Sequence, residues 1–516
     1  MEVGLRKFES FVLPDSIDSP GIRHEISKVY STVEEFPRNK EQSFFDTFDW
    51  RLYNKGLTLL KESAVYHLRL LRQDREVATS SLKTRVQPKF WWEFPDGSLK
   101  EELKSCLGVR ALLPLASSQI RSQVLCILNQ DKKTVLRVYV GEIFIGKGRS
   151  DQRRTSNITM QPVRGYEKEL QEFRQFLHTL GLKSEKRDTF AIALAAHDKQ
   201  PGDYSSKLNI SLSPEWSCRV AARKIFSCLH NVMKQNEAGI KADIDTEFLH
   251  DFRVAIRRTR SALTQLKSVF PGEITDRYKQ DFASLGKLTN RLRDLDVYLL
   301  KRDEYQAMLP QYLSSDLAPM FETLRRERKR EHQKLVRALG TAPYEKIIAS
   351  WQEFLTQPEA AQSGPAKNSN KPVFELAQKF IWRKYNRVMT LGETITDDSP
   401  DPELHSLRIE CKKLRYLLEF FASLFPANEV ASLIKQLKKM QDNLGAYNDL
   451  YVEQESLKEF LSSDIRSEKH QNTTAAIGGL IAVLYQRQLR LRQAFAQSFS
   501  QFRAPKNAVL FNKLFG

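Results

Sequence analysis

Two segments of this chain repeat each other without a gap, and each opens a basic stripe with a histidine. Residues 249–297 align with residues 404–452 at a constant shift of 155 positions (405 − 250). Eleven residues of the first segment are identical in the second, namely Leu249, His250, Arg253, Arg260, Leu263, Ser268, Phe270, Pro271, Asp294, Leu295 and Val297. Such similarity predicts a duplicated unit of several helices. Because the histidine and cations are kept along with the packing leucines, we expect the unit to bind something anionic twice.

Each stripe is predicted to lie along one helix. The first helix is expected to begin near Thr246 and the second within residues 400–403, where Ser, Asp and Pro supply start signals. At about 100° per residue, the first stripe shares one face except for its flanking residue Arg258. Its members are His250, Arg253, Arg257, Arg258 and Arg260, and those of the second stripe are His405, Arg408, Lys412, Lys413 and Arg415. Stacked like charges cost about 0.2–0.5 kcal/mol per pair, so an anion is expected along this face.

Alternative interpretations of the stripes remain open at this point. A single helix of this composition is equally well a solvated, salt-bridged surface, and repetition favours the ligand-binding interpretation. Asp294 and its counterpart Asp449 are interpreted as acids that orient arginines. Each histidine is interpreted as a hydrogen-bonding group at the helix start, as a phosphate donor whose charge depends on pH, or as both.

The type of cation indicates the type of anion. A mixture of arginine and lysine suits an extended polyanion held by many contacts, and residues 250–260 span roughly 15 Å of helix. Base recognition needs aromatic side chains between the cations, and only Tyr416 lies beside the second stripe. Nucleic acid therefore ranks last among the predicted partners, behind phosphate without bases.

Composition sets broader limits. The chain has 516 residues and a formal charge of +18, which predicts two or three domains and an anionic partner. Its scattered cysteines lack metal or redox spacing and are interpreted as reduced thiols; they are Cys106, Cys126, Cys218, Cys228 and Cys411. The longest apolar run, residues 475–485, is too short to span a membrane. With no targeting segment apparent, we expect a cytoplasmic protein without a membrane partner.

The pattern along the chain predicts a mixed α+β protein. Short β-branched and aromatic runs within residues 1–195 predict a mainly antiparallel β domain, which ends with a helix at about residues 167–180. Residues 196–214 are predicted to be a linker. Residues 215–505 are predicted to be helical, with repeats at about 215–345 and 373–500. The stretch at residues 358–372 is interpreted as a surface linker between the repeats.

The helical region resembles the CHAD domain, a conserved-histidine α-helical domain. The resemblance covers residues 216–502 and is carried by both stripes, by Arg293, Asp294, Asp296 and Val297, by Tyr416, and by Leu444, Gly445, Asn448 and Asp449. It implies two pseudo-twofold-related helical bundles. It also implies a basic groove or channel that binds inorganic polyphosphate, often at polyphosphate granules.

Residues 1–190 resemble a CYTH, or triphosphate-tunnel, domain. The match is best over residues 44–59, and it implies a closed antiparallel β-barrel that holds a triphosphate and divalent metal. The family's Glu-x-Glu-x-Lys strand is degenerate here, since Gly4 replaces one carboxylate and Arg6 replaces the lysine after Glu2. We therefore expect a barrel that has lost its hydrolase activity. Candidate lining cations, equally well solvated surface residues, are Arg69, Arg72, Lys83, Arg85 and Arg137.

The leading hypothesis is a polyphosphate-binding protein without catalytic residues, cofactor or bound metal. The full set of predicted binding residues is His250, Arg253, Arg257, Arg258, Arg260, Arg293, His405, Arg408, Lys412, Lys413, Arg415 and Tyr416, with Arg223 and Arg383 on the preceding helices and Lys438 and Lys439 after the second stripe. The alternative is a triphosphatase that uses Mg²⁺ or Mn²⁺ in the first domain. Whether the two repeats share one ligand stays open, as does the oligomeric state.

Overall fold

The computed structural model describes residues 9–14, 17–71, 75–82, 86–145, 153–183, 189–357, 366–396, 398–464 and 471–516. The chain divides into two compact units, residues 1–205 and residues 206–516. This division falls inside the segment predicted as a linker.

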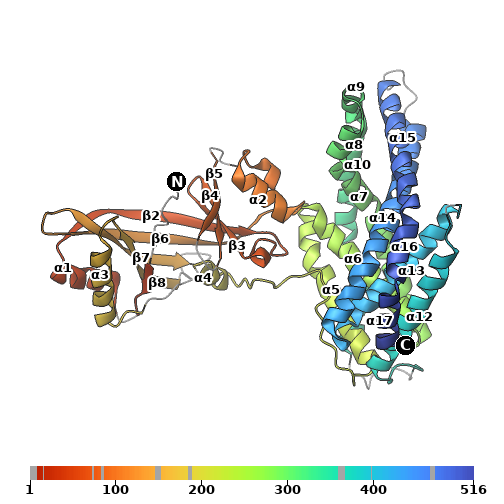
Figure 1. The fold of residues 1–516 in the computed structure, drawn as a ribbon, viewed down its shortest axis with the longest axis horizontal. Coiled ribbons are helices and arrows are strands. Elements are labelled where there is room, and N and C mark those ends of the chain that lie inside the picture. The colour runs from red at the N-terminus through yellow and green to blue at the C-terminus, as the bar shows by residue number, and fades with distance from the viewer. Residues whose placement is uncertain are drawn as a thin grey trace. The chain divides into compact units, whose positions relative to one another are not determined.

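Unit 1, residues 1–205, is built on one antiparallel sheet (Figure 1). Its strands are β1 (Glu9–Val12), β2 (Thr32–Asp46), β3 (Leu57–Glu62), β4 (Val65–Leu70), β5 (Glu76–Ser81), β6 (Leu113–Leu128), β7 (Thr134–Ile145) and β8 (Arg153–Pro162). They pair in the order β1-β8-β7-β6-β2-β3-β4-β5. The predicted α+β class with an antiparallel first domain is confirmed.

The predicted closure of this sheet into a barrel is wrong for the described strands, because β1 and β5 remain separate edges. The register explains the open form. β2 pairs with β6 along most of its length, from Thr32 to Asp46, but pairs with β3 only through residues 42–45. β3, β4 and β5 therefore extend the sheet from one end of β2. β7, β8 and β1 extend it beyond β6, on the side away from β2.

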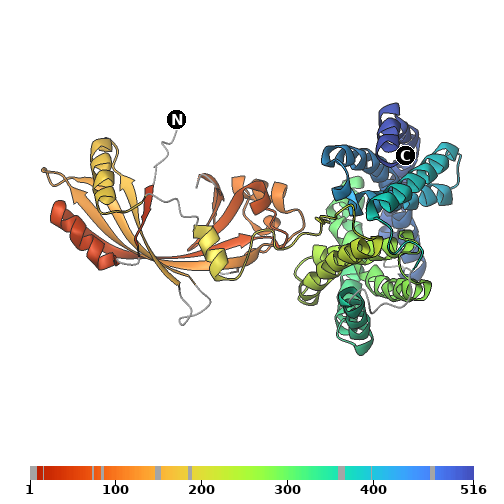
Figure 2. The ribbon, with the colours of Figure 1, turned by 90° about the horizontal axis from the view of Figure 1, so that it is seen from below.

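Helices cover the two ends of this curved sheet separately (Figure 2). At one end α1 (Ser19–Val29) and α3 (Glu167–Thr179) bury a core that includes Ile26 and Phe173. At the other end α2 (Ser98–Leu107) packs over a second core. A third cluster gathers under α4 (Thr189–Ala196). These separate cores, each with its own helices, stabilise a long open sheet without the need for barrel closure.

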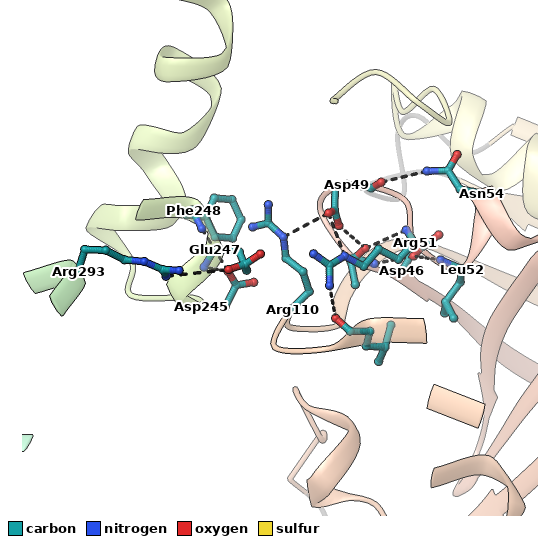
Figure 3. A network of polar contacts seen from close by, with 12 residues as sticks. Asp46, Asp49, Arg51, Leu52, Asn54, Arg110, Asp245, Glu247, Phe248 and Arg293 are labelled. Atoms are coloured by element: carbon teal, nitrogen blue, oxygen red, sulfur yellow. Dashed lines mark hydrogen bonds and ion pairs between the residues drawn. The ribbon is translucent and has the colours of Figure 1, made fainter. Parts of the chain in front are cut away.

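The end of β2 is held by a buried carboxylate. Asp46 accepts hydrogen bonds from the backbone N–H groups of Thr47, Leu52 and Tyr53, at 2.7, 2.9 and 2.8 Å. Figure 3 shows Asp46 next to Leu52. Burial raises the pKa of Asp46 to about 6, although these three donors act in the opposite direction. Beside it, Arg51 Nε lies 3.0 Å from Asp49 Oδ2. Asp46 thus satisfies the backbone of a tight turn, which is a structural role.

Unit 2, residues 206–516, is helical, as predicted. Its α-helices are α5 (Cys218–Lys241), α6 (Thr246–Gln265), α7 (Gly272–Leu300), α8 (Arg302–Met308), α9 (Gln311–Ser314), α10 (Ala318–Ala338), α11 (Ala342–Thr356), α12 (Val373–Thr394), α13 (Asp401–Phe420), α14 (Ala427–Asp464), α15 (Gln471–Gln493), α16 (Phe495–Arg503) and α17 (Pro505–Phe515). The apolar run 475–485 lies within α15. Among the described residues, no helix meets the length and hydropathy that a membrane span requires.

The helix boundaries confirm the repeat. The starts of α5, α6 and α7 shift by 155 positions onto the starts of α12, α13 and α14 (373 − 218, 401 − 246 and 427 − 272). The ends of α6 and α13 differ by the same number (420 − 265). The two repeats contact each other through α6 and α13, the helices that carry the basic stripes. The stripes of both repeats are therefore placed on neighbouring helices.

A second part of unit 2 rises beside this contact (Figure 1). The ends of α7 and α14 continue beyond the stripes and pack with α8, α10 and α15 around a core that includes Leu295, Phe321 and Leu480. This core fixes the long helices α7 and α14 at their far ends. They consequently provide stiff walls alongside α6 and α13.

Candidate anion-binding site

Local sequence explains how α6 presents its cations. Asp245 caps the helix by accepting hydrogen bonds from the N–H groups of Glu247 and Phe248, at 2.9 and 3.3 Å. Phe248 is buried against α5, where a Cβ on Gly239 would lie only 2.1 Å from its ring. This close approach of α5 and α6 buries the apolar side of α6. The other side, with Arg257 and Arg260 exposed, faces away from that core.

Arg253 of the first stripe is held by hydrogen bonds to α7. Its Nη1 donates to Thr289 Oγ1 at 2.7 Å, to Asn290 Oδ1 at 2.9 Å and to the carbonyl of Gly286 at 3.4 Å. Burial, reinforced by the charge of Arg257, lowers the pKa of Arg253 to about 10, so the guanidinium stays protonated at neutral pH. Neutral oxygen acceptors on α7 thus fix a charged group without neutralising it.

The second stripe is held differently. Arg408 Nη2 lies 3.3 Å from Asp449 Oδ1, which bears out the interpretation of Asp449 as an arginine-orienting acid. His405 Nδ1 lies 2.6 Å from Asn448 Oδ1. The first-repeat counterpart Asp294 acts electrostatically on Arg253, and His250 is half-buried on α6. Each repeat therefore anchors its first arginine to the next helix, one with neutral oxygens and the other with a carboxylate.

The positive charge of Arg257 acts on cations of both stripes. Burial is the main cause that lowers the pKa of Arg253, Arg293, Arg408 and Lys412, and the positive charge of Arg257 lowers it further in all four cases. Two of these partners belong to the first repeat and two to the second. The structure therefore brings Arg253, Arg257 and Arg293 together with Arg408 and Lys412 in a single cationic cluster, which we call the central cluster.

Lys412 is the counterpart of Arg257 in the second repeat (412 − 257 = 155). Burial and then the charges of Arg408 and Arg257 lower the pKa of Lys412 to about 8. Within the described part of the chain, neither Arg257 nor Lys412 forms an ion pair with a carboxylate. The charge of Asp449 offsets part of the repulsion at Lys412, but burial and the neighbouring cations outweigh it. A bound anion would therefore stabilise this pair of cations.

Arg293 extends the central cluster toward the start of α6. Its Nη1 donates to the carbonyl of Thr246 at 3.2 Å and lies 4.0 Å from Glu247 Oε1 (Figure 3). Glu247 neutralises part of its charge. Arg293 therefore both stabilises the first turn of α6 and contributes to the field around Arg257.

Three of the predicted binding residues instead form a clasp between the repeats. Arg258 Nη2 lies 2.8 Å from Glu419 Oε2, and Arg415 Nε lies 3.1 Å from the other oxygen of the same carboxylate. Both guanidinium groups also lie over the ring of Tyr416, which is buried. Glu419, an acid that the sequence analysis did not single out, thus pairs with both arginines, and these residues hold α6 to α13.

The remaining predicted residues lie outside the central cluster. Lys413 and Lys384 share Glu410, at 2.6 and 2.5 Å. Arg223 donates to the carbonyl of Phe354 at 2.8 Å and so ties α5 to α11. The other three are exposed, namely Arg383 on α12 and Lys438 and Lys439 on α14. Arg260 lines a cavity next to the cluster.

That cavity contains polar residues which sequence reasoning missed. Lys287, Thr289 and Asn290 of α7 line it together with Arg253, Arg257 and Arg260 of α6. A signal was present in the spacing, because Lys287 and Asn290 precede Asp294 by seven and four positions and share its helix face. Only the packing of α7 on α6 shows that this face meets the stripe.

Unit 1 offers less to a ligand. Arg137 Nε lies 3.5 Å from Glu35 Oε1, and Arg69 is half-buried on β4. Residues Glu2, Gly4, Arg6, Arg72, Lys83 and Arg85 lie outside the described residues. In the described ranges, no group of three or more His, Cys, Asp or Glu side chains is arranged to hold a metal ion.

Comparison with known proteins places the helical unit in a family. No curated protein matches the chain. The crystal structure of the CHAD domain from the plant Ricinus communis is similar at 22% identity and a TM-score of 0.48, over 57% of this chain and 94% of that chain. PptA from Streptomyces chartreusis is similar at 14% identity and a TM-score of 0.43, over 56% and 100%. The antiparallel sheet of unit 1 is consistent with the resemblance to a CYTH domain.

The family model of the CHAD domain matches residues 225–458, which run from α5 into α14 and include both basic stripes. The stripes, their 155-residue repeat and the packing of α6 on α13 all lie inside this match. Residues 225–458 of this chain form a CHAD domain.

Proposed function

We propose that this protein binds inorganic polyphosphate, or a similar phosphate polyanion, and that the two repeats hold one polymer together. The observation that carries the proposal is the central cluster, in which Arg257 of one repeat acts electrostatically on Arg408 and Lys412 of the other. Two independent sites would keep their cations apart, since like charges repel. One ligand with successive negative groups relieves the repulsion on both helices at once.

The chemistry of the cluster favours phosphate without bases. Tyr416, the aromatic residue beside the second stripe, is buried between Arg258 and Arg415 and offers no face for base stacking. Phe252, within the first stripe, is buried as well. Single-stranded oligonucleotides should therefore compete poorly with polyphosphate at equal phosphate concentration. Because cations do the binding, it needs no divalent metal, and a chelator should leave the affinity unchanged. In the cell, we expect the protein at polyphosphate granules.

A binding titration with long-chain polyphosphate tests this proposal. The variant replaces Arg253, Arg257, Arg408 and Lys412 by alanine, and we expect it to lose at least a hundredfold in affinity. The wild type should weaken steeply with added salt, and the variant should have a slope shallower by about 3 in a plot of log affinity against log salt. The matched control replaces Lys329, Arg330, Lys346 and Lys506, four exposed cations on α10, α11 and α17.

The control removes the same net charge from outside the central cluster. Its affinity should stay within a few-fold of the wild type. Equal losses in the two variants would show that net charge alone attracts the polymer, and the proposed site would be wrong. An unchanged affinity in the first variant would have the same consequence.

A further inference from the structure

The cavity beside the central cluster lies between α6 and α7, and its volume is about 290 Å³. Its polar and charged lining comes from both helices and consists of Arg253, Arg257, Arg260, Lys287, Thr289 and Asn290. Ile256 and Ala283 form the apolar part of the wall. Four cations around one small space create a site for a compact anion with several negative oxygens.

The cations of this cavity are partly organised before any ligand binds. Thr289 and Asn290 hold the guanidinium of Arg253 with hydrogen bonds of 2.7 and 2.9 Å. Arg257, Arg260 and Lys287 are exposed side chains at the cavity. One fixed donor and three adaptable ones can surround a tetrahedral group, whose oxygens point in different directions.

Gly286 keeps the cavity open. A Cβ at this position would meet only Arg260 Nη1 at 3.7 Å and Ile256 Cγ2 at 3.9 Å, so a small side chain fits but a long one would fill the space. In the second repeat the equivalent residue is Gln441, which is buried. Its Oε1 accepts a hydrogen bond of 3.0 Å from Arg415 Nη1, the counterpart of Arg260. The second repeat thus fills the equivalent place and occupies its arginine.

The other α7 residues that line the cavity also differ from their counterparts on α14 in the second repeat. Lys287 corresponds to Asp442, Thr289 to Leu444 and Asn290 to Gly445, each at the shift of 155. The α6 wall, in contrast, is similar in kind, since Arg253, Arg257 and Arg260 correspond to Arg408, Lys412 and Arg415. The second repeat consequently has a similar basic stripe. On the facing helix, however, it has Asp442 where the first repeat has Lys287, and Gln441 where Gly286 leaves a space.

We propose that the cavity is a subsite for one terminal phosphoryl group, present in the first repeat alone. The inference rests on the proposed function and adds the direction in which the polymer lies. The end of the polymer would be held at α7, and the chain would continue across Arg257 toward Lys412. A terminal phosphoryl group carries up to two negative charges near neutral pH, whereas a group inside the chain carries one. Free inorganic phosphate offers the same chemistry, so the test must separate it from a chain end.

Calorimetric titrations of the full chain with three phosphate compounds separate these sources. Linear tripolyphosphate has terminal groups, cyclic trimetaphosphate has none, and inorganic phosphate is a free ion. We expect tripolyphosphate to bind at one per chain and at least tenfold more tightly than either of the others. Equal affinity for the cyclic compound, or a tighter affinity for inorganic phosphate, would overturn the assignment of a chain end.

Substitutions at equivalent positions of α7 and α14 locate the site. Gly286→Gln places in the first repeat the side chain that fills the second, and we expect it to weaken tripolyphosphate binding about tenfold. Gly286→Ala is the matched control, since its Cβ meets only ordinary contacts, and Gln441→Ala is the control in the other repeat. Gln441→Ala should bind within twofold of the wild type, and Gly286→Ala should bind more tightly than Gly286→Gln. A thermal melt of each variant verifies folding.

The outcomes distinguish this inference from the proposed function. If the wild type binds long-chain polyphosphate but Gly286→Gln binds tripolyphosphate as well as Gly286→Ala does, the subsite is wrong and the shared site stands. A loss with Gln441→Ala equal to that with Gly286→Gln would contradict the difference between the repeats. If the wild type binds neither linear compound, the proposed function itself fails.

Discussion

Arg257 and Lys412 occupy the same position in the two repeats and lie close enough for the charge of Arg257 to lower the pKa of Lys412. Neither forms an ion pair with a carboxylate in the part of the chain that the structure describes. Neighbouring cations on the same helices behave otherwise, since Arg258 is paired with Glu419 and Lys413 with Glu410. The contact between the repeats thus concentrates the cations that remain available to a ligand.

The titration of Lys412 should give polyphosphate binding a pH dependence. Its pKa is lowered to about 8 in the free protein, and a bound polyanion favours the charged form. Affinity should therefore fall as pH rises from 7 to 9, with proton uptake on binding in that range. Lys412→Arg keeps its charge to much higher pH and should flatten the profile. Parallel profiles for the two proteins would show that Lys412 does not contact the polymer.

Lys412 should also lower the stability of the free protein. Its folded-state pKa of about 8 lies below the ordinary value of 10.5, so the folded protein disfavours the proton. The resulting penalty is full below pH 8 and disappears as pH rises to about 10.5. Lys412→Met should therefore raise Tm by a few degrees at pH 7, and its advantage should shrink by pH 10. Thermal melts across this range measure the effect, and a lower Tm at pH 7 would contradict it.

The clasp formed by Glu419 should contribute to stability more than to binding. Its removal by Glu419→Ala leaves Arg258 with no carboxylate partner, although the side chain of Arg258 is only 12% exposed. We expect a loss of about 1–3 kcal/mol in the free energy of unfolding, measured by denaturant titration. Polyphosphate affinity, measured below the transition, should change less than fivefold. A stable variant with a large loss of affinity would assign the clasp to the binding site.

Sequence patterns predicted the repeat well because helix periodicity and a constant shift are local properties of the chain. The start of α6 follows from its capping residue Asp245, and that of α13 from the Pro and Asp residues at positions 400–402. Barrel closure was predicted wrongly because it depends on register between distant strands, and β3 pairs with β2 only at residues 42–45. No local pattern reports that register.

The site was predicted in part for a similar reason. The stripes were visible, and helix geometry placed Arg258 at the flank of the first stripe, but Arg257 and Arg258 were both predicted to bind the ligand. Glu419, which neutralises Arg258, comes from the other repeat, 161 positions away. The space beside Gly286 likewise depends on how α7 packs on α6. Contacts between helices decide which cations remain free, and they follow only from the three-dimensional structure.

The claim that the two repeats form one site is tested most directly by calorimetric titration of long-chain polyphosphate into Arg257→Ala, Lys412→Ala and the double variant at pH 7. A control that lacks Lys346 and Lys506 matches the charge of the double variant. If one polymer crosses both repeats, each single substitution should weaken binding by about five- to tenfold and leave the stoichiometry unchanged. Two independent sites would instead give half the binding capacity in each single variant with the wild-type affinity, and that result would contradict the shared site.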